Sequence, residues 1–453
     1  MTAEPKASSR SSRATCAAFV LAGALVACAG SSAGGPDAAD TSAPTASTAR
    51  SSPTTTEAAP TTDTPPTDAP ASDDAPVVTP TTEVDDTGTT NAEAPERCVE
   101  QLSVRDRAAL LVWPAVYAED WPGAIETVRQ HDVGGVLLMG QAELGGPDIA
   151  ARLAELESAS RHGLIVATDE EGGTVQRLRG LGALGSQREV SSALSAEQAA
   201  DLIAAHGDAV RAAGIDMVLG PVIDVEPNVG EVPLDASRLF DGDPERVAQY
   251  GAAYLSGWFR AQLFATVKHY PGHGAASGDT HITAGVTPSL ADLRSFDLEP
   301  YITLADDVRR TDAAVMVGHL TVPGLTDGVP ATRSPAAVSY LRNDLGYGDV
   351  LLMTDALGMA AVGLAEPEAS VLAIAAGLDV VLFTMSSQTG AVIDALESAV
   401  ETGRIDVAHL DAAARKVMRM LARDGHTCDV NRASSVTETS SGVTSSPCDA
   451  ADS

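Results

Sequence analysis

Short apolar runs recur along the middle of the chain, and each is followed by a more polar stretch. Eight such runs are present, at residues 110–116, 134–139, 163–173, 215–225, 263–273, 313–320, 349–357 and 378–383. Segments between them, such as 196–214 and 288–308, carry apolar residues at helical spacing. Continuous apolar strands that alternate with helices indicate a parallel sheet covered on both faces. Eight units over about 330 residues predict a single α/β domain, a (β/α)8 barrel of the TIM type. The pattern alone leaves an open doubly wound sheet as the alternative.

Charged and histidine side chains stand at the carboxyl ends of five of these runs. They are Asp169, Asp224, Lys268, His269, His319 and Asp355. A buried parallel strand has no structural need for a charge at its end, whereas the active site of a barrel is built at this rim. One such residue is readily explained as the cap of a helix, but six together predict a catalytic site.

The first 27 residues have the character of a targeting segment. Lys6, Arg10 and Arg13 precede a short apolar run over residues 14–27, which is below the roughly 20 residues that span a bilayer. The run ends Leu-Val-Ala-Cys, which resembles the lipobox of bacterial lipoproteins and implies cleavage before Cys28 and lipidation of its thiol. A plain secretory signal is the alternative. We therefore expect an extracytoplasmic protein held at the cell membrane by its lipid alone.

Two segments lack the apolar residues needed for a core. Residues 28–97 are rich in Thr, Pro, Ala, Ser and Asp, and residues 427–453 have the same character. Such segments cannot bury enough apolar surface to offset their ordering entropy. The sequence therefore predicts a disordered tether over 28–97, a catalytic domain over 98–426 and a flexible tail over 427–453.

The chain is strongly acidic, with 62 acidic and 29 basic residues and a net charge of −33. This charge argues against nucleic acid and anionic lipid headgroups as partners. Lysine is rare: Lys6, Lys268 and Lys416 are the only three. A lysine within a motif of this arginine-rich chain therefore indicates a specific role.

A dense polar motif follows the fifth apolar run. It reads Lys-His-Tyr-Pro-Gly-His-Gly over 268–274, and Asp279-Thr280-His281 follows after four residues. This motif resembles the signature of the β-N-acetylglucosaminidase branch of glycoside hydrolase family 3. Three further stretches resemble segments of that branch in the same order: Asp-x-Glu-Gly-Gly from Asp169 with Arg177, Gly-Pro-Val-Ile-Asp-Val over 220–225, and Thr-Asp-Ala-Leu-Gly-Met over 354–359. The resemblance covers about residues 100–425.

The spacing and residue types of Asp279 and His281 suit acid/base chemistry, independently of the family resemblance. Two residues apart in an extended loop, their side chains can lie on one side of the backbone. An aspartate on one imidazole nitrogen sets the tautomer, while the other nitrogen exchanges a proton with substrate. The pKa of histidine, about 6.5, suits donation to a leaving oxygen and then deprotonation of water. A lone exposed histidine without function is the alternative reading.

The resemblance implies roles for further residues. It makes Asp355 the nucleophile that forms a covalent glycosyl–enzyme intermediate, with His281 and Asp279 as the acid/base pair in place of the usual second carboxyl group. It places the substrate sugar among Asp169, Arg177, Arg238, Lys268 and His269, whose charged groups suit hydroxyl-rich ligands. His273, and Glu171 with it, is expected to brace the site.

The sequence departs from the family pattern at two places. Thr174 stands where the family often has arginine, which puts the local sugar contacts in doubt. Around Arg238, Ala236-Ser237 replaces the family's Gly-Asp, and Leu239 replaces its serine. The role of Arg238 therefore transfers less firmly than the others.

Cysteine placement suggests one disulfide. Cys98 and Cys428 bracket the globular region, and the first and last elements of a barrel are neighbours, so they can pair in an oxidising compartment. Cys428 with Cys448 is the competing pair.

These features together predict a monomeric, retaining β-N-acetylglucosaminidase that removes terminal N-acetylglucosamine from glycans, with peptidoglycan fragments (muropeptides) as the expected substrate. Chitin oligosaccharides or another β-hexosaminide are alternatives, and neither a cofactor nor a metal is implied. A phosphorylase that uses phosphate in place of water is a rival. Family 3 β-glucosidases are disfavoured because their acid/base lies in a second domain. A solute-binding lipoprotein would share the anchor and tether but would not need Asp279, His281 and Asp355.

Overall fold

The eight apolar runs form the eight strands of a parallel barrel. The computed structural model describes residues 93–140, 146–227, 234–278, 280 and 285–426. The barrel strands are β1 (Val112–Tyr117), β2 (Gly135–Met139), β3 (Ile165–Thr168), β6 (Met217–Val218), β7 (Phe264–Tyr270), β9 (Ala314–Val317), β11 (Leu352–Thr354) and β12 (Val381–Phe383). Each pairs in parallel with the next, and β12 pairs with β1. The predicted barrel is confirmed, and the open sheet is excluded.

The barrel closes between β11 and β12. A parallel bridge joins Met353 to Val380, and the backbone N–H of Thr354 donates to the carbonyl of Val380 at 3.0 Å. The hydroxyl of Thr354 also accepts from the backbone N–H of Leu382 at 2.9 Å. Closure satisfies the two sheet edges, which would otherwise expose unpaired backbone groups.

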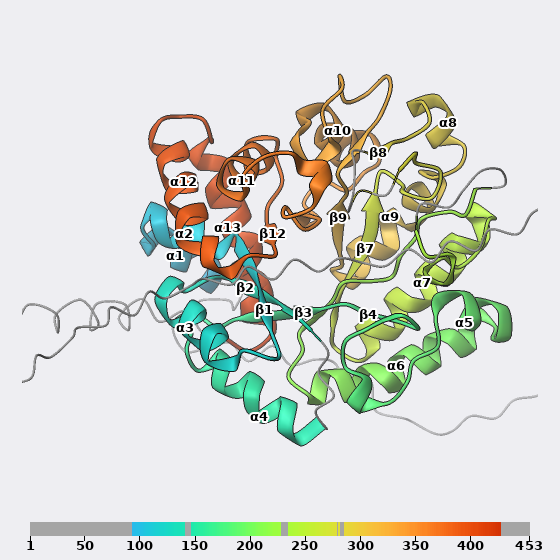
Figure 1. Ribbon diagram of the computed structural model, residues 1–453, viewed down its shortest axis with the longest axis horizontal. Helices are drawn as coiled ribbons and strands as arrows, with labels where there is room; N and C mark the ends of the chain where they lie inside the picture. Colours follow the sequence, from blue (N-terminus) through green and yellow to red (C-terminus); the bar gives the residue numbers. More distant parts are fainter. Residues whose placement is uncertain (1–92, 141–145, 228–233, 279, 281–284, 427–453) are drawn as a thin grey trace, which may run out of the picture. The chain divides into compact units, whose positions relative to one another are not determined.

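Helices lie around the outside of the strands (Figure 1). They are α1 (Glu93–Gln101), α2 (Val104–Leu110), α3 (Trp121–His131), α4 (Gly146–Glu157), α5 (Gln187–Ala193), α6 (Ala196–Ala212), α7 (Pro244–Arg260), α8 (Leu290–Arg294), α9 (Glu299–Thr311), α10 (Pro335–Ser339), α11 (Glu366–Ala375), α12 (Thr389–Glu401) and α13 (Val407–Arg423). None of the helices within the described ranges has the length and apolar character needed to cross a bilayer.

Local sequence explains where the long helices begin. Ser195 caps α6 in a reciprocal pair with Gln198, and Asp243 caps α7 with Pro244 in its first turn. The 288–308 segment, where the sequence shows helical spacing, forms two helices, α8 and α9. Pro300 lies in the first turn of α9. Proline is tolerated there but not inside a helix.

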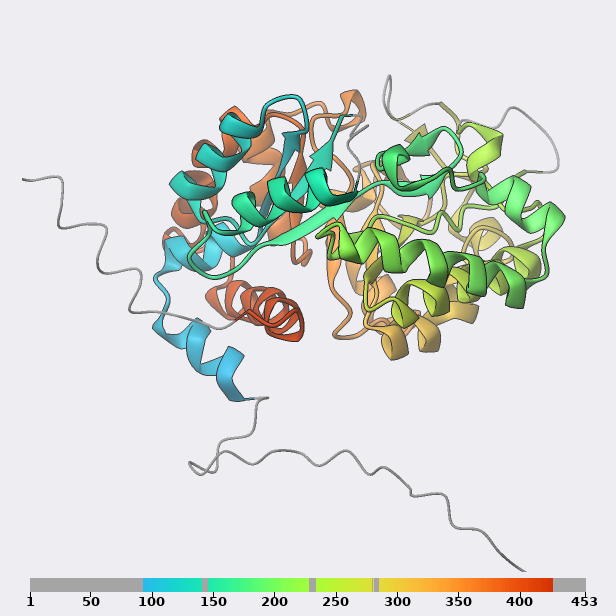
Figure 2. The ribbon, with the colours of Figure 1, turned by 90° about the horizontal axis from the view of Figure 1, so that it is seen from below.

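The first and last described helices pack together. α1 and α2 contact α13 across the junction where the barrel closes (Figure 2). Cys98, in α1, is buried and disulfide-bonded. The predicted partner Cys428 lies outside the described residues, as do Cys28, residues 28–92 of the predicted 28–97 tether and the tail over 427–453, so those interpretations stay predictions. Residues 93–97, the end of the predicted tether, are instead helical and belong to α1.

Short elements after the strands carry the polar residues. The strands are shorter than the apolar runs: β3 stops at Thr168, and residues 170–176 form the antiparallel hairpin of β4 (Glu170–Gly172) and β5 (Val175–Gln176). A turn of 3-10 helix over Ala236–Arg238 follows β6, and a short parallel pair joins β8 (Gly285–Val286) to β10 (Leu320–Thr321). These pieces stand at the carboxyl ends of the strands, where barrels place their sites.

Candidate active site

A cavity of about 250 Å³ opens at the carboxyl ends of the strands. All six of the predicted nucleophile and sugar-binding residues line it: Asp169, Arg177, Arg238, Lys268, His269 and Asp355. Glu171, His273, Thr280 and several apolar side chains complete the wall. The strand-end residues that are far apart in the sequence therefore meet in one place.

Lys268 is the centre of the charged side of this cavity. Its ammonium lies 2.9 Å from Oδ1 of Asp169 and 2.6 Å from Oε1 of Glu171, and its side chain is almost fully buried. Burial acts to lower the pKa of Lys268, but the two carboxylates outweigh it and raise the pKa. An ammonium has three donors, so one is left to point at a ligand.

Glu171 is held from two sides. Arg238 donates from Nε to Oε2 at 2.7 Å and from Nη2 to Oε1 at 2.8 Å, so Oε1 is shared by Arg238 and Lys268. Burial acts to raise the pKa of Glu171, but Lys268 and Arg238 bring it down to about 2. The carboxylate is therefore ionised and orients both cations, which is the bracing role predicted for it.

Asp169 and Glu170 have different tasks although they are adjacent. Asp169 faces the cavity between Lys268 and Arg177, whose Nη2 lies 3.4 Å from Oδ2. Glu170 is fully buried and accepts from the side chain of Gln176 and from the backbone N–H groups of Arg177 and Leu178. Glu170 therefore shapes the hairpin, and Asp169 is left to contact a ligand.

Asp224 orients His269. The carboxylate accepts from Nδ1 of His269 at 2.7 Å and from the backbone N–H groups of His269 and His273. Burial acts to raise the pKa of Asp224, but the two histidines lower it. With Nδ1 committed to Asp224, Nε2 is the ring nitrogen available to the cavity.

Asp355 directly follows β11 and lines the cavity. Its Oδ1 accepts from the backbone N–H of Ala356 at 2.8 Å, and its own N–H donates to the carbonyl of Val317 at 2.9 Å. Burial acts to raise the pKa of Asp355, but His269, His319 and the Ala356 N–H lower it. The carboxylate is ionised, as a nucleophile must be.

His319 fixes the backbone beside Asp355. Its Nε2 lies 3.0 Å from the carbonyl of Ala356, and its Nδ1 lies 3.0 Å from the hydroxyl of Thr332. Burial lowers the pKa of His319, and because a carbonyl oxygen can only accept, Nε2 is the donor toward Ala356. This strand-end histidine supports the nucleophile rather than lining the cavity.

The predicted acid/base residues Asp279 and His281 lie outside the described residues, but Thr280 between them is described and lines the cavity. Its hydroxyl is 3.1 Å from Nε2 of His273, and its carbonyl accepts from the N–H of Ala361 at 3.2 Å. Burial lowers the pKa of His273 to about 4, so the ring is neutral at physiological pH. These contacts are the ones that a loop-bracing His273 requires.

The two departures from the family pattern meet in space. The hydroxyl of Thr174, in the β4–β5 hairpin, donates to Oδ2 of Asp235 at 3.0 Å. Asp235 caps the turn that carries Arg238, by accepting from the N–H of Ser237. This hydrogen bond is a second link between the β4–β5 hairpin and the turn, in addition to the Glu171–Arg238 ion pair.

Sequence reasoning underrated several residues. Glu171 holds both Lys268 and Arg238, and Asp224 orients the ring of His269 and holds the backbone of His273. The sequence placed Asp224 at the rim without a specific role and gave Glu171 only a bracing one. Their positions in the Asp-x-Glu-Gly-Gly and Gly-Pro-Val-Ile-Asp-Val stretches were the available indication. The apolar wall residues Leu137, Met139, Met359 and Leu382 carried no such indication.

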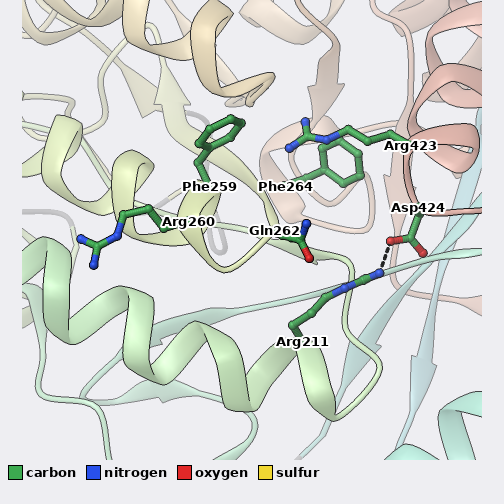
Figure 3. Close-up of a pocket in the computed structure, with 7 residues that line it drawn as sticks. All are labelled: Arg211, Phe259, Arg260, Gln262, Phe264, Arg423 and Asp424. Carbon is green, nitrogen blue, oxygen red and sulfur yellow. Dashed lines mark ion pairs between the residues drawn. The ribbon is translucent and has the colours of Figure 1, made fainter. Parts of the chain in front are cut away.

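A second, larger cavity of about 410 Å³ lies at the opposite, amino end of the strands. Figure 3 shows its arginines and phenylalanines, with Arg211 paired to Asp424. Arg211 also pairs with Asp216, while Arg423 stacks over Phe264 at 4.7 Å and pairs with Asp312 at 3.1 Å. Its charges are satisfied within the protein, so this cavity is built as a structural junction of α6, α7 and α13.

Comparisons with known proteins identify the family of this chain. The model of the glycosyl hydrolase family 3 N-terminal domain matches residues 104–420. The chain is 37% identical over 342 residues to the beta-hexosaminidase LpqI of Mycobacterium tuberculosis, covering 72% of this chain and 86% of the relative.

Solved structures of family 3 enzymes are similar in fold to this chain. The M. tuberculosis LpqI structure has a TM-score of 0.66 at 36% identity, covering 72% of this chain and 96% of that one. A family 3 beta-N-acetylglucosaminidase from Paenibacillus has a TM-score of 0.65 at 28% identity, covering 72% of this chain and 63% of that one. The chain belongs to glycoside hydrolase family 3, and it is a glycoside hydrolase.

Proposed function

We propose that this enzyme is a retaining β-N-acetylglucosaminidase, with Asp355 as nucleophile and His281, supported by Asp279, as acid/base. The observation that carries the proposal is the ionised Asp355 in a cavity that is also lined by Asp169, Arg177, Arg238 and Lys268. The names of the relatives, a beta-hexosaminidase and a beta-N-acetylglucosaminidase, support the sugar.

In the first step, a carboxylate oxygen of Asp355 attacks the anomeric carbon while the bond to the leaving oxygen breaks. His281 gives its proton to that oxygen, which departs as an alcohol. In the second step, His281 takes a proton from water, whose oxygen attacks the anomeric carbon and releases Asp355. Two displacements at one carbon retain its configuration.

The charged wall suits the hydroxyls of the bound sugar. Lys268 keeps one N–H beyond its two carboxylate contacts, and Arg238 keeps Nη1 beyond its bidentate pair with Glu171. Asp169 adds an acceptor, and Nε2 of His269 adds a further polar contact. Ionic partners hold these groups before substrate arrives, which lowers the cost of binding.

Peptidoglycan fragments are the proposed natural source of the sugar, and the cell envelope is the proposed location. The lipobox-like Leu-Val-Ala-Cys that ends at Cys28 supports a lipid anchor facing the wall. Product analysis on purified muropeptides beside chitobiose tests the substrate. Rates with and without added phosphate test hydrolysis against phosphorolysis.

The nucleophile is tested by substitution and labelling. Asp355→Ala should lose nearly all turnover with the fold intact, and a mechanism-based fluorosugar should label Asp355 in the wild type. Asp349→Ala is the matched control, because Asp349 is an exposed aspartate near the other end of the same strand. A label on another residue, or more than a few per cent of activity in Asp355→Ala, would refute the assignment.

A further inference from the structure

The rim of the active-site cavity is divided into two arcs. Over β3 to β7 its charged side chains are Asp169, Arg177, Arg238 and Lys268, with Val175, Leu219 and Leu234 among them. After β11 and β2 it is lined by Met359 and Met139, and next to these stand Tyr117 at the end of β1 and Met385 after β12. We call Tyr117, Met139, Met359 and Met385 the apolar arc.

Tyr117 is the anchor of this arc. It ends β1 in register with Met139 of β2, and register partners in a parallel sheet point to the same side. Met139 lines the cavity, so Tyr117 stands on the cavity side as well. Its hydroxyl donates to the carbonyl of Thr384, itself a cavity residue, at 3.3 Å.

These side chains are unusually exposed for their type. Tyr117 is 39% exposed and Met385, next to Thr384, is 52% exposed. Only 4% of the chain is aromatic, and Phe259 is the other aromatic side chain of the described residues with similar exposure, at the amino end of the barrel. Apolar groups that stand exposed beside a site indicate a contact surface.

The volume of the cavity indicates which part of the substrate contacts the apolar arc. At about 250 Å³ it lies below the ~300–1,000 Å³ of pockets that enclose drug-sized ligands, so it holds one sugar residue. That sugar becomes attached to Asp355, which lines the cavity. A cavity filled by one sugar leaves no room for the leaving group, which must therefore lie outside it and depart into solvent.

We propose that the apolar arc is the subsite for the leaving group, and that it binds the leaving sugar residue through its apolar C–H face and acyl methyl group. The inference rests on the proposed function and adds the chemistry of the second substrate residue. Tyrosine and methionine offer broad, polarisable surfaces that suit a C–H-rich ring, and none of the four side chains carries a charge.

Two substrates with the same reacting sugar separate the subsites. N-acetylglucosaminyl β-fluoride has a leaving group of one atom, which cannot reach the arc, whereas chitobiose places a whole sugar there. Tyr117→Ala should lower kcat/KM on chitobiose by about three- to tenfold and leave the fluoride unchanged. Tyr117→Phe should keep most of the chitobiose activity, because the ring and not the hydroxyl makes the contact.

Phe259→Ala is the matched control, since Phe259 is equally exposed but lies at the amino end of the barrel. Equal losses on both substrates in Tyr117→Ala would overturn the proposal and place Tyr117 against the reacting sugar. If Tyr117→Ala loses activity on neither chitobiose nor the fluoride, the apolar arc does not bind the leaving group, and the proposal is wrong. A wild-type enzyme inactive on both substrates would overturn the proposed function itself, and the subsite with it.

Discussion

Arg238 donates two hydrogen bonds to Glu171, at 2.7 and 2.8 Å, while Lys268 contacts the same carboxylate at 2.6 Å. One buried acid thus orients two cations that face the cavity. Removing it would leave two buried positive charges with only the remaining contact of Lys268 to Asp169.

Glu171→Gln should therefore destabilise the fold by about 3–5 kcal/mol, because breaking a buried ion pair strands its partner. The pKa of Glu171 is depressed to about 2 from 4.5, so its contribution is present above pH 4.5 and is lost as pH falls toward 2. Urea unfolding at pH 7 and at pH 3 should show the difference between variant and wild type shrinking at the lower pH. Glu368→Gln, at an exposed pair with Arg404, is the control. A constant difference would contradict the ionised state.

His281→Ala should lose about 10²–10⁴-fold on natural disaccharides, the usual contribution of a general acid/base. An activated aryl glycoside departs without a proton, so its first step should be spared and azide should rescue its second. Asp279→Asn should give a milder form of the same defect. Equal losses on both kinds of substrate, without rescue, would show that His281 only positions substrate.

Asp297 should make stability depend on pH. It lies beneath Gly272, is 1% exposed, and burial together with Asp224 raises its pKa to about 7. Between the unfolded pKa of 3.8 and the folded pKa of about 7, the carboxyl group of Asp297 is protonated in the folded state but ionised in the unfolded state. The contribution of Asp297 to the free energy of unfolding is therefore full below about pH 4 and is lost as pH rises through 7.

Asp297→Asn cannot titrate, so its unfolding free energy should fall less steeply than that of the wild type. The slopes between pH 4 and 7 should differ by up to about 1.4 kcal/mol per pH unit. Urea titrations at unit intervals of pH measure this, with the highly exposed Asp306→Asn as control. Parallel curves for Asp297→Asn and wild type would mean that Asp297 is already ionised.

Cys98→Ser should lower the free energy of unfolding by roughly 2–5 kcal/mol under oxidising conditions, because the disulfide restricts the unfolded chain. A reducing agent should remove the difference from the wild type. A non-reduced peptide map should join Cys98 to Cys428. A bridge from Cys428 to Cys448 would refute that pairing.

The fold and the charged half of the site followed from the sequence by itself. Barrel strands are buried on both faces, so they appear in the sequence as continuous apolar runs with helices between them. Packing of the core does not require a charged residue at the end of such a strand, so a charge there indicates a site. For that reason Asp169, Lys268, His269 and Asp355 could be assigned to one rim before their distances were known.

Only the tertiary structure decided how these groups are supported. That Glu171 joins Lys268 to Arg238, and that Thr174 meets Asp235, depends on loops from different strands touching, which no local pattern encodes. The apolar arc shows this most clearly. Tyr117 and Thr384 are 267 residues apart and come together because β12 pairs with β1 in the barrel. Apolar residues at strand ends look like ordinary core in a sequence, and closure alone determines that Tyr117 and Met385 stand exposed beside the cavity.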